Sequence, residues 1–204
     1  MAAQASHVVY ADKALKTILK GRKVNEKDYF LGTLFPDIRY LAKIDRNLTH
    51  FSAITVDNLV SAKSDFELGM LVHSLVDTER EKIIGNTGIY SSLPTEIGIY
   101  TFVKLVEEIY TYPIYENWVN ITDFLNDVLV DETRFISEAS VRQWHSILRD
   151  FFTNAPTTKS LLKFAEAIGI KKEATALYAK YGHLANNVSL ISAIKSIYPS
   201  LFAE

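Results

Sequence analysis

The stretch KSDFELGMLVHSLVDTEREKI, residues 63–83, decides the fold. Its apolar residues recur at helical spacing, and between Phe66 and Val76 they cover nearly every side of such a helix. A helix that is apolar all round is buried, whereas a surface helix keeps one polar face. We therefore expect residues 63–83 to form a helix at the centre of the core.

Two further helices are expected before this central one. Apolar residues recur at helical spacing over residues 6–19, with Ser6 in the position of a cap. Residues 25–35 begin at Asn25, whose side chain is a favoured cap, and stop before Pro36. A proline disfavours helix in the residue that precedes it, so the second helix should end there.

The second half of the chain is also helical in pattern. Residues 85–94 form the clearest irregular loop because they contain two glycines and a proline, and Ser92 is placed to cap the next helix. Further helical patterns run through residues 94–110, 116–129, 137–152, 157–169, 172–182 and 189–198. No segment alternates convincingly at period two, so we expect an all-α bundle of several helices.

Composition limits the class of protein. A chain of 204 residues with 48% hydrophobic residues is large enough for one filled core, so we expect a single domain over residues 1–204. The formal net charge of −2 gives no evident nucleic-acid footprint. No run approaches the roughly 20 apolar residues that span a bilayer, and the first residues do not form a signal peptide. We expect a cytoplasmic protein that is not integral to a membrane.

Metal chemistry is limited by the absence of cysteine, which excludes disulfides and thiolate ligands. His73 and Asp77 lie four residues apart, so both point from one face of the central helix and can chelate one cation. The alternative is a hydrogen bond on a helix surface. The apolar residues around the pair favour chelation, because a buried carboxylate needs a cation or several donors.

Three other polar residues lie beside apolar segments. His7 shares a helical face with apolar residues, so it should point inward, although an exposed terminal histidine is the alternative. Asp37 follows Pro36 and is either a solvated turn residue, a helix cap or a buried ligand. His50 lies between Thr49 and a phenylalanine and is either a surface imidazole or a ligand.

The order of these residues carries a family resemblance. His7, then LGTLFPD (31–37), then THF (49–51), then FELGMLVHSLVDT (66–78) resembles the zinc-dependent phospholipase C family and the related single-strand nucleases. The resemblance covers roughly the first eighty residues and is specific in order and context. It places the metal-site motifs in residues 6–81 and leaves residues 92–204 as additional packing helices.

The resemblance implies a zinc site between helices of the N-terminal half. Carried over by position, Asp37, His50, His73 and Asp77 complete one zinc site, and His7 with the other oxygen of Asp77 forms a second. The residues that hold a third metal in the family are missing, because no histidine is followed four residues later by a glutamate. Glu81, one turn beyond Asp77, is a candidate extra ligand. The resemblance thus implies one to two zinc ions.

The activity implied is metal-assisted hydrolysis of a phosphoester, with a small phosphoester or a phospholipid head group as substrate. Asp37 would orient or deprotonate the attacking water, and Asp77 would bridge the ions. Arg39 and Arg46 are candidate phosphate contacts, with solvated helix charges as the alternative.

Two other classes of protein are alternatives to this activity. A His-Asp dyad phosphohydrolase is excluded because no histidine is followed directly by an aspartate. The rival that remains is a non-catalytic helical protein that retains a structural or degenerate metal site.

Overall fold

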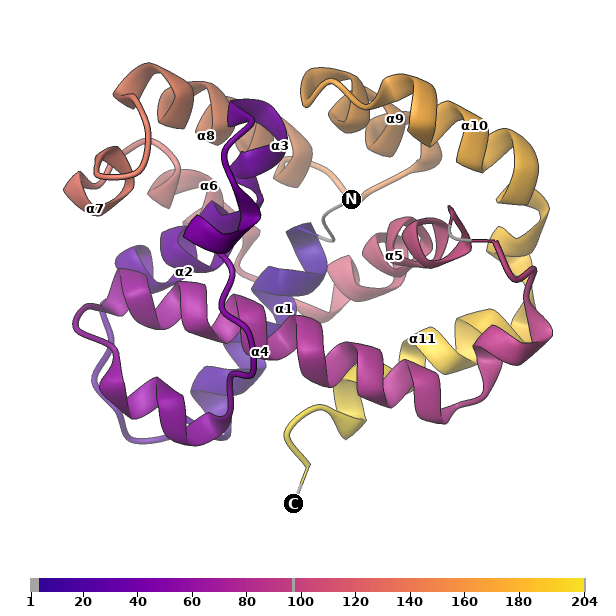
Figure 1. Cartoon of the computed structure of the whole chain (residues 1–204), viewed down its shortest axis with the longest axis horizontal. Coiled ribbons are helices and arrows are strands. Elements are labelled where there is room, and N and C mark those ends of the chain that lie inside the picture. Colours follow the sequence, from indigo (N-terminus) through magenta and orange to yellow (C-terminus); the bar gives the residue numbers. More distant parts are fainter. Residues whose placement is uncertain (1–3, 97, 204) are drawn as a thin grey trace.

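The computed structural model describes residues 4–96 and 98–203, and every regular element in these residues is helical. Figure 1 shows them as one all-α domain, which confirms the predicted fold class. The α-helices are α1 (Gln4–Lys16), α2 (Glu26–Leu34), α3 (Arg39–Ala42), α4 (Asp65–Asn86), α5 (Gly98–Thr111), α6 (Trp118–Phe124), α7 (Val130–Thr133), α8 (Glu138–Phe152), α9 (Thr158–Ala167), α10 (Lys171–Tyr181) and α11 (Val188–Ser200). Short 3₁₀ turns join them: η1 (Phe35–Ile38), η2 (Arg46–Leu48), η3 (Val56–Ser61), η4 (Ile89–Ser92), η5 (Tyr112–Ile114) and η6 (Gly182–Asn186).

Helix α4 is the central element, as the sequence predicts. The Ser64 side chain caps it by accepting from the backbone N–H of Glu67, and the residues from Phe66 to Val76 are buried except Glu67. Figure 1 shows α4 crossing the middle of the molecule, with α2 beside its N-terminal half and α11 beside its C-terminal half. Helix α1 also packs against it. The core therefore surrounds the helix that carries the predicted ligand pair.

Two glycines let α2 and α4 touch through their backbones. A Cβ atom on Gly32 would lie 2.0 Å from the carbonyl oxygen of Phe66, and one on Gly69 would lie 2.1 Å from that of Tyr29. Neither position has room for a side chain. The close crossing brings η1, which follows α2, next to the turn of α4 that holds His73.

Some of the predicted helix caps differ from the structure. Asn25 caps α2 as expected. Ser6 does not cap α1, because it lies inside that helix, buried, with its hydroxyl 2.8 Å from that of Thr111. Ser92 lies in η4 and does not cap α5, which begins at Gly98.

A side chain from another helix binds the start of α1, as far as the structure describes it. The Glu108 carboxyl of α5 accepts hydrogen bonds from the backbone N–H groups of Ala5 and Ser6, at 2.8 and 3.0 Å. These are N–H groups of the first helical turn, which have no partner within their own helix. The tertiary contact therefore fixes α1, and with it His7, against α5.

The C-terminal helices complete the core. Helix α5 packs against α1, α10 and α11, and α8 packs against α6 and α9. A buried His145 on α8 lies 2.8 Å from a carboxylate oxygen of Glu132, in α7, so it pairs within the core. Across the described residues, no helix is long and apolar enough to cross a membrane.

Candidate metal centre

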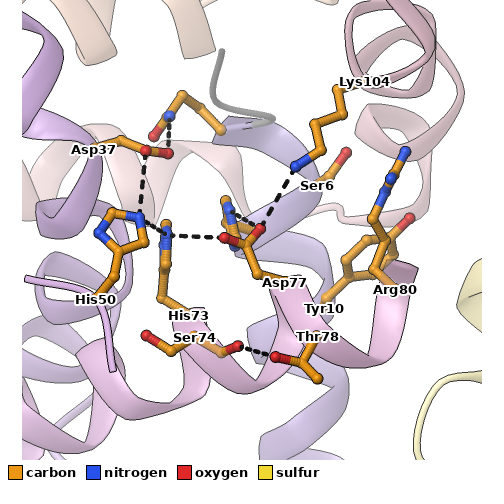
Figure 2. A network of polar contacts seen from close by, with 12 residues as sticks. Ser6, Tyr10, Asp37, His50, His73, Ser74, Asp77, Thr78, Arg80 and Lys104 are labelled. Carbon is orange, nitrogen blue, oxygen red and sulfur yellow. Dashed lines mark hydrogen bonds and ion pairs between the residues drawn. The ribbon is translucent and has the colours of Figure 1, made fainter. Parts of the chain in front are cut away.

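Five side chains from four segments of the chain converge between α1, α4 and the residues that follow α2. His7 comes from α1, Asp37 from η1, His50 from the residues after η2, and His73 and Asp77 from α4. Figure 2 shows Asp37, His50, His73 and Asp77 pointing toward one another. The five residues that the sequence singled out as ligands thus lie together, and all come from residues 6–81.

Local structure explains how each ligand reaches the centre. His73 and Asp77 are one turn apart on α4 and therefore share a face. Pro36 lies in η1, where α2 gives way to a tighter turn, and Asp37 follows it with only 4% of its surface exposed. The Thr49 hydroxyl donates to the Pro36 carbonyl at 3.1 Å, which holds the His50 segment against η1.

Hydrogen bonds determine which nitrogen of each imidazole carries the proton. His73 Nδ1 donates to the Thr33 carbonyl at 2.9 Å, which leaves the lone pair on Nε2. The Thr49 hydroxyl donates to a carbonyl, so it accepts from His50 Nδ1 at 3.1 Å, and His50 also keeps its lone pair on Nε2. These two Nε2 atoms face each other at 3.2 Å. Neither carries a hydrogen, so the two lone pairs repel each other, and a cation between them would offset that repulsion.

The other ligand distances fit the same interpretation. Asp77 Oδ1 lies 3.5 Å from His7 Nε2, Asp77 Oδ2 lies 3.9 Å from His73 Nε2, and Asp37 Oδ1 lies 3.8 Å from His50 Nε2. Donor atoms bound to a tetrahedral zinc ion at about 2.0–2.1 Å lie about 3.3–3.4 Å from one another. The observed separations are near this value, so small side-chain movements bring the donors into range.

Two overlapping groups of donors can hold an ion. One consists of His7, Asp37 and His73, the other of His50, His73 and Asp77, and within each group the ligand atoms lie within 4.8 Å of one another. His73 belongs to both, and its ring stacks on that of His7 with the centroids 3.7 Å apart. Because Nδ1 of His73 is engaged by Thr33, its Nε2 can bind one ion at a time.

Burial sets the charge state of the donors. Burial, with His73 close by, lowers the pKa of His7 to about 3, and the same causes lower that of His50 to about 4. Burial favours raised carboxyl pKa values, but the neighbouring imidazoles outweigh it and hold the pKa of both Asp37 and Asp77 below the ordinary value. At neutral pH the imidazoles of His7 and His50 are therefore neutral and the two carboxyl groups are ionised, which are the protonation states that bind a divalent cation.

Two polar residues that sequence reasoning missed support the carboxylates. Gln4 Nε2 donates to Asp37 Oδ2 at 2.9 Å, and Lys104 Nζ on α5 lies 3.9 Å from Asp77 Oδ1. Lys104 is the single charged residue in the largely apolar run from Ile99 to Val106, which is a usable sequence signal. Gln4 gives no such signal, because nothing in the sequence links it to Asp37.

An open cleft of about 330 Å³ lies beside the centre. Asp77 is the ligand that reaches it, since its side chain is 26% exposed while His73 is 1% exposed. The residues that line the cleft are Arg46, Phe51, Ser52, Ser74, Asp77, Thr78, Glu81 and Lys104. A ligand in this cleft would contact Asp77 and two cationic side chains.

The remaining predicted residues lie at different distances from the centre. Arg46 lines the cleft, with Nη2 3.9 Å from Asp77 Oδ2. Arg39 does not line it, and its guanidinium instead stacks over the Tyr40 ring, 4.0 Å from the centroid. Glu81 also lines the cleft but belongs to neither donor group, and it accepts from Arg80 at 2.6 Å.

Comparisons of the chain with models of known protein families, with curated proteins and with solved structures found no match. The motif order and the geometry of the five side chains are therefore the features that bear on function.

Proposed function

We propose that this chain is a zinc-dependent phosphoester hydrolase, similar to the phospholipase C-like enzymes that its N-terminal motifs resemble. The observation that carries the proposal is the pair of imidazole Nε2 atoms of His50 and His73, which face each other at 3.2 Å with both Nδ1 atoms engaged elsewhere. Two carboxylates approach the same point. This arrangement is unfavourable without a cation and suits one well.

Zinc is the metal that suits these donors. It binds neutral imidazole and carboxylate at four-coordinate sites, and the chain offers no sulfur. In the proposal, Asp37, His50, His73 and Asp77 hold one ion. His7, whose Nε2 lies 3.5 Å from Asp77 Oδ1, holds a second ion with that oxygen.

The chain's own residues then have distinct roles in hydrolysis. A bound divalent cation lowers the pKa of a water molecule and neutralises charge on phosphoryl oxygens. Asp37 would hold the ion through Oδ1, and its Oδ2, which accepts a hydrogen bond from Gln4, would orient the attacking water and accept its proton. Asp77 holds its position between the buried ligands and the cleft. Arg46 contacts the substrate phosphate, whereas the stacking of Arg39 on Tyr40 makes it the weaker candidate.

The test combines metal analysis with a panel of substrates. Protein purified without added zinc is analysed for metal, and the zinc-loaded protein is assayed with nitrophenyl phosphoesters, nucleotides and phosphatidylcholine. We expect zinc-dependent turnover of at least one class and its loss in Asp77→Ala. His183→Ala, a histidine outside the centre, serves as the matched control and should keep full activity. Absence of zinc-dependent turnover across the panel would overturn the catalytic proposal.

A second candidate is a structural metal site without catalysis. Burial favours it, because His7, Asp37, His50 and His73 each have at most 7% of their surface exposed. The missing family residues for a third metal point the same way. This candidate predicts stoichiometric zinc and metal-dependent stability with no turnover in the same panel.

A further inference from the structure

Two cations of the cleft share Asp77. Lys104 Nζ lies 3.9 Å from its Oδ1, and Arg46 Nη2 lies 3.9 Å from its Oδ2. Figure 2 shows Lys104 reaching Asp77 from the side away from His50. Both distances exceed hydrogen-bond length, so each contact is an ion pair without a close hydrogen bond. Asp77 therefore balances one positive charge from α5 and one from η2 at the mouth of the metal centre.

The same carboxylate is needed by the metal. When Asp77 binds a cation, its negative charge is largely neutralised, and Lys104 and Arg46 lose their shared counter-charge. Glu81 cannot replace it fully. One of its oxygens accepts from Arg80 at 2.6 Å and lies 3.5 Å from Lys104, so that carboxylate is already shared.

We propose that Lys104 and Arg46 form a binding site for a terminal phosphate group, and that this site becomes available when Asp77 holds a metal ion. The proposal rests on the proposed function, because it concerns the same site. It adds a substrate class and a contact between the substrate phosphate and the Lys104 ammonium group of α5. The cleft of about 330 Å³ that both side chains line is large enough for a phosphate and a small organic group.

The chemistry of the two side chains selects the ligand. A guanidinium matches two phosphate oxygens at once, and an ammonium adds a compact charge. Two cations attract a dianion more strongly than a monoanion. A phosphomonoester, with its dianionic terminal phosphate, is therefore favoured over a diester.

Metal and phosphate binding should also help each other. Because a metal ion on Asp77 raises the affinity for phosphate, phosphate must raise the affinity for metal by the same factor. This reciprocity distinguishes the proposal from a basic surface patch, which would bind phosphate regardless of metal.

Equilibrium dialysis with labelled inorganic phosphate at low concentration tests the proposal on the full chain, with and without zinc. We expect zinc loading to raise phosphate affinity about tenfold or more, as for a gained charged hydrogen bond. Dimethyl phosphate, a monoanionic diester, should compete poorly. Lys104→Gln and Arg46→Gln should each lower phosphate affinity about tenfold while zinc stoichiometry stays unchanged.

The controls separate charge from folding. Lys104→Arg keeps the charge and should retain phosphate binding. Lys82→Gln removes an exposed lysine of α4 that pairs with Glu79 outside the cleft, and it should change nothing. Arg46 is 55% exposed, so its variant tests the site even if Lys104→Gln does not fold.

The outcomes distinguish this proposal from the proposed function. If zinc binds and phosphate affinity is independent of zinc or unchanged in both charge variants, the phosphate site is wrong and the hydrolase proposal stands. If dimethyl phosphate competes as well as phosphate, the preference for a phosphomonoester is wrong. If the chain binds no zinc, both proposals are overturned.

Discussion

Two backbone carbonyls decide which nitrogen of each central imidazole is free to bind. The Thr33 carbonyl accepts directly from His73, and the Pro36 carbonyl acts through the Thr49 hydroxyl on His50. Such partners beyond the ligands fix the tautomer and ring orientation of metal-bound histidines. The threonine that precedes His50 in the sequence thus has a physical role in the candidate site.

Thr49→Val tests that role, since it keeps the shape of the side chain and removes the acceptor for His50 Nδ1. We expect zinc affinity to fall about 10–100-fold, as is typical when such a partner is lost. Competition with a chromogenic chelator measures the change. Thr87→Val, whose hydroxyl also donates to a carbonyl but lies at the far end of α4, is the control. Equal affinities in the two variants would contradict the assigned tautomer.

His7→Ala separates the two proposed ions. Asp37, His50, His73 and Asp77 still supply four ligands, so we expect one zinc ion per chain and an intact fold. Hydrolysis should nevertheless drop steeply, because paired ions stabilise both the attacking and the leaving oxygen. Metal analysis measures the number of zinc ions per chain, and the phosphoester assay measures the rate of hydrolysis. If the variant turns over substrate as fast as the wild type, His7 has no part in a second catalytic ion.

At the scale of elements, the crossing of α2 and α4 positions the ligands. Gly69→Ala would place a Cβ atom 2.1 Å from the backbone oxygen of Tyr29, and backbone atoms cannot move aside cheaply. We expect a loss of about 3 kcal/mol in the free energy of unfolding, at the upper end for overpacking. Zinc affinity should fall too, because separating the helices moves Asp37 away from His73.

Gly85→Ala is the matched control on the same helix. Nothing lies within 4 Å of a Cβ atom added there. Replacing a helical glycine by alanine stabilises by about 0.5–1 kcal/mol when there is room. Urea unfolding of both variants measures the contrast, and similar stabilities would show that the close crossing does not constrain the fold.

The contact between α1 and α5 should make stability depend on pH. Burial raises the pKa of the Glu108 carboxyl to about 8 from its ordinary value of 4.5, against the opposing effect of the Ser6 and Ala5 N–H groups. The folded state thus holds this proton more tightly than the unfolded state. The stability that the protonated Glu108 carboxyl contributes is complete below pH 4.5 and is lost as the pH rises through about 8.

The comparison of wild type with Glu108→Gln isolates this group. Between pH 5.5 and 7.5 the wild type should lose about 2 kcal/mol of unfolding free energy relative to the variant, since one proton contributes about 1.4 kcal/mol per pH unit. Denaturant unfolding at both pH values, in chelator, measures it. Parallel pH profiles would mean that Glu108 titrates normally.

At the scale of the whole molecule, the features that could be predicted from the sequence are those that depend on the local pattern of residues. Helical periodicity identified α4 as central, and the motif order identified the five candidate ligands that converge, because each lies on or beside an element with a clear pattern. It did not predict that Glu108 replaces Ser6 as the cap of α1, nor that Lys104 lies at Asp77. Those contacts depend on how α5 packs in three dimensions, which spacing along the chain does not encode.

The metal should stabilise the whole domain, because the ligands come from α1, η1, the loop after η2 and α4. When the free metal concentration is 100 times the dissociation constant, binding of the ion adds about 2.7 kcal/mol to the free energy of unfolding. For a domain of this size that corresponds to roughly 5–10 °C in melting temperature. Excess chelator should therefore lower the melting temperature of zinc-containing wild type by this amount.

Asp77→Ala should melt at one temperature with or without chelator, because the variant lacks the carboxylate that both proposed ions use. Asp150→Ala, an exposed aspartate on α8 that pairs with Lys163, should keep the full sensitivity of the wild type. An unchanged melting curve of the wild type in excess chelator, on protein shown beforehand to contain zinc, would contradict a stabilising ion. In that case the facing Nε2 atoms of His50 and His73 would need another partner to offset their repulsion.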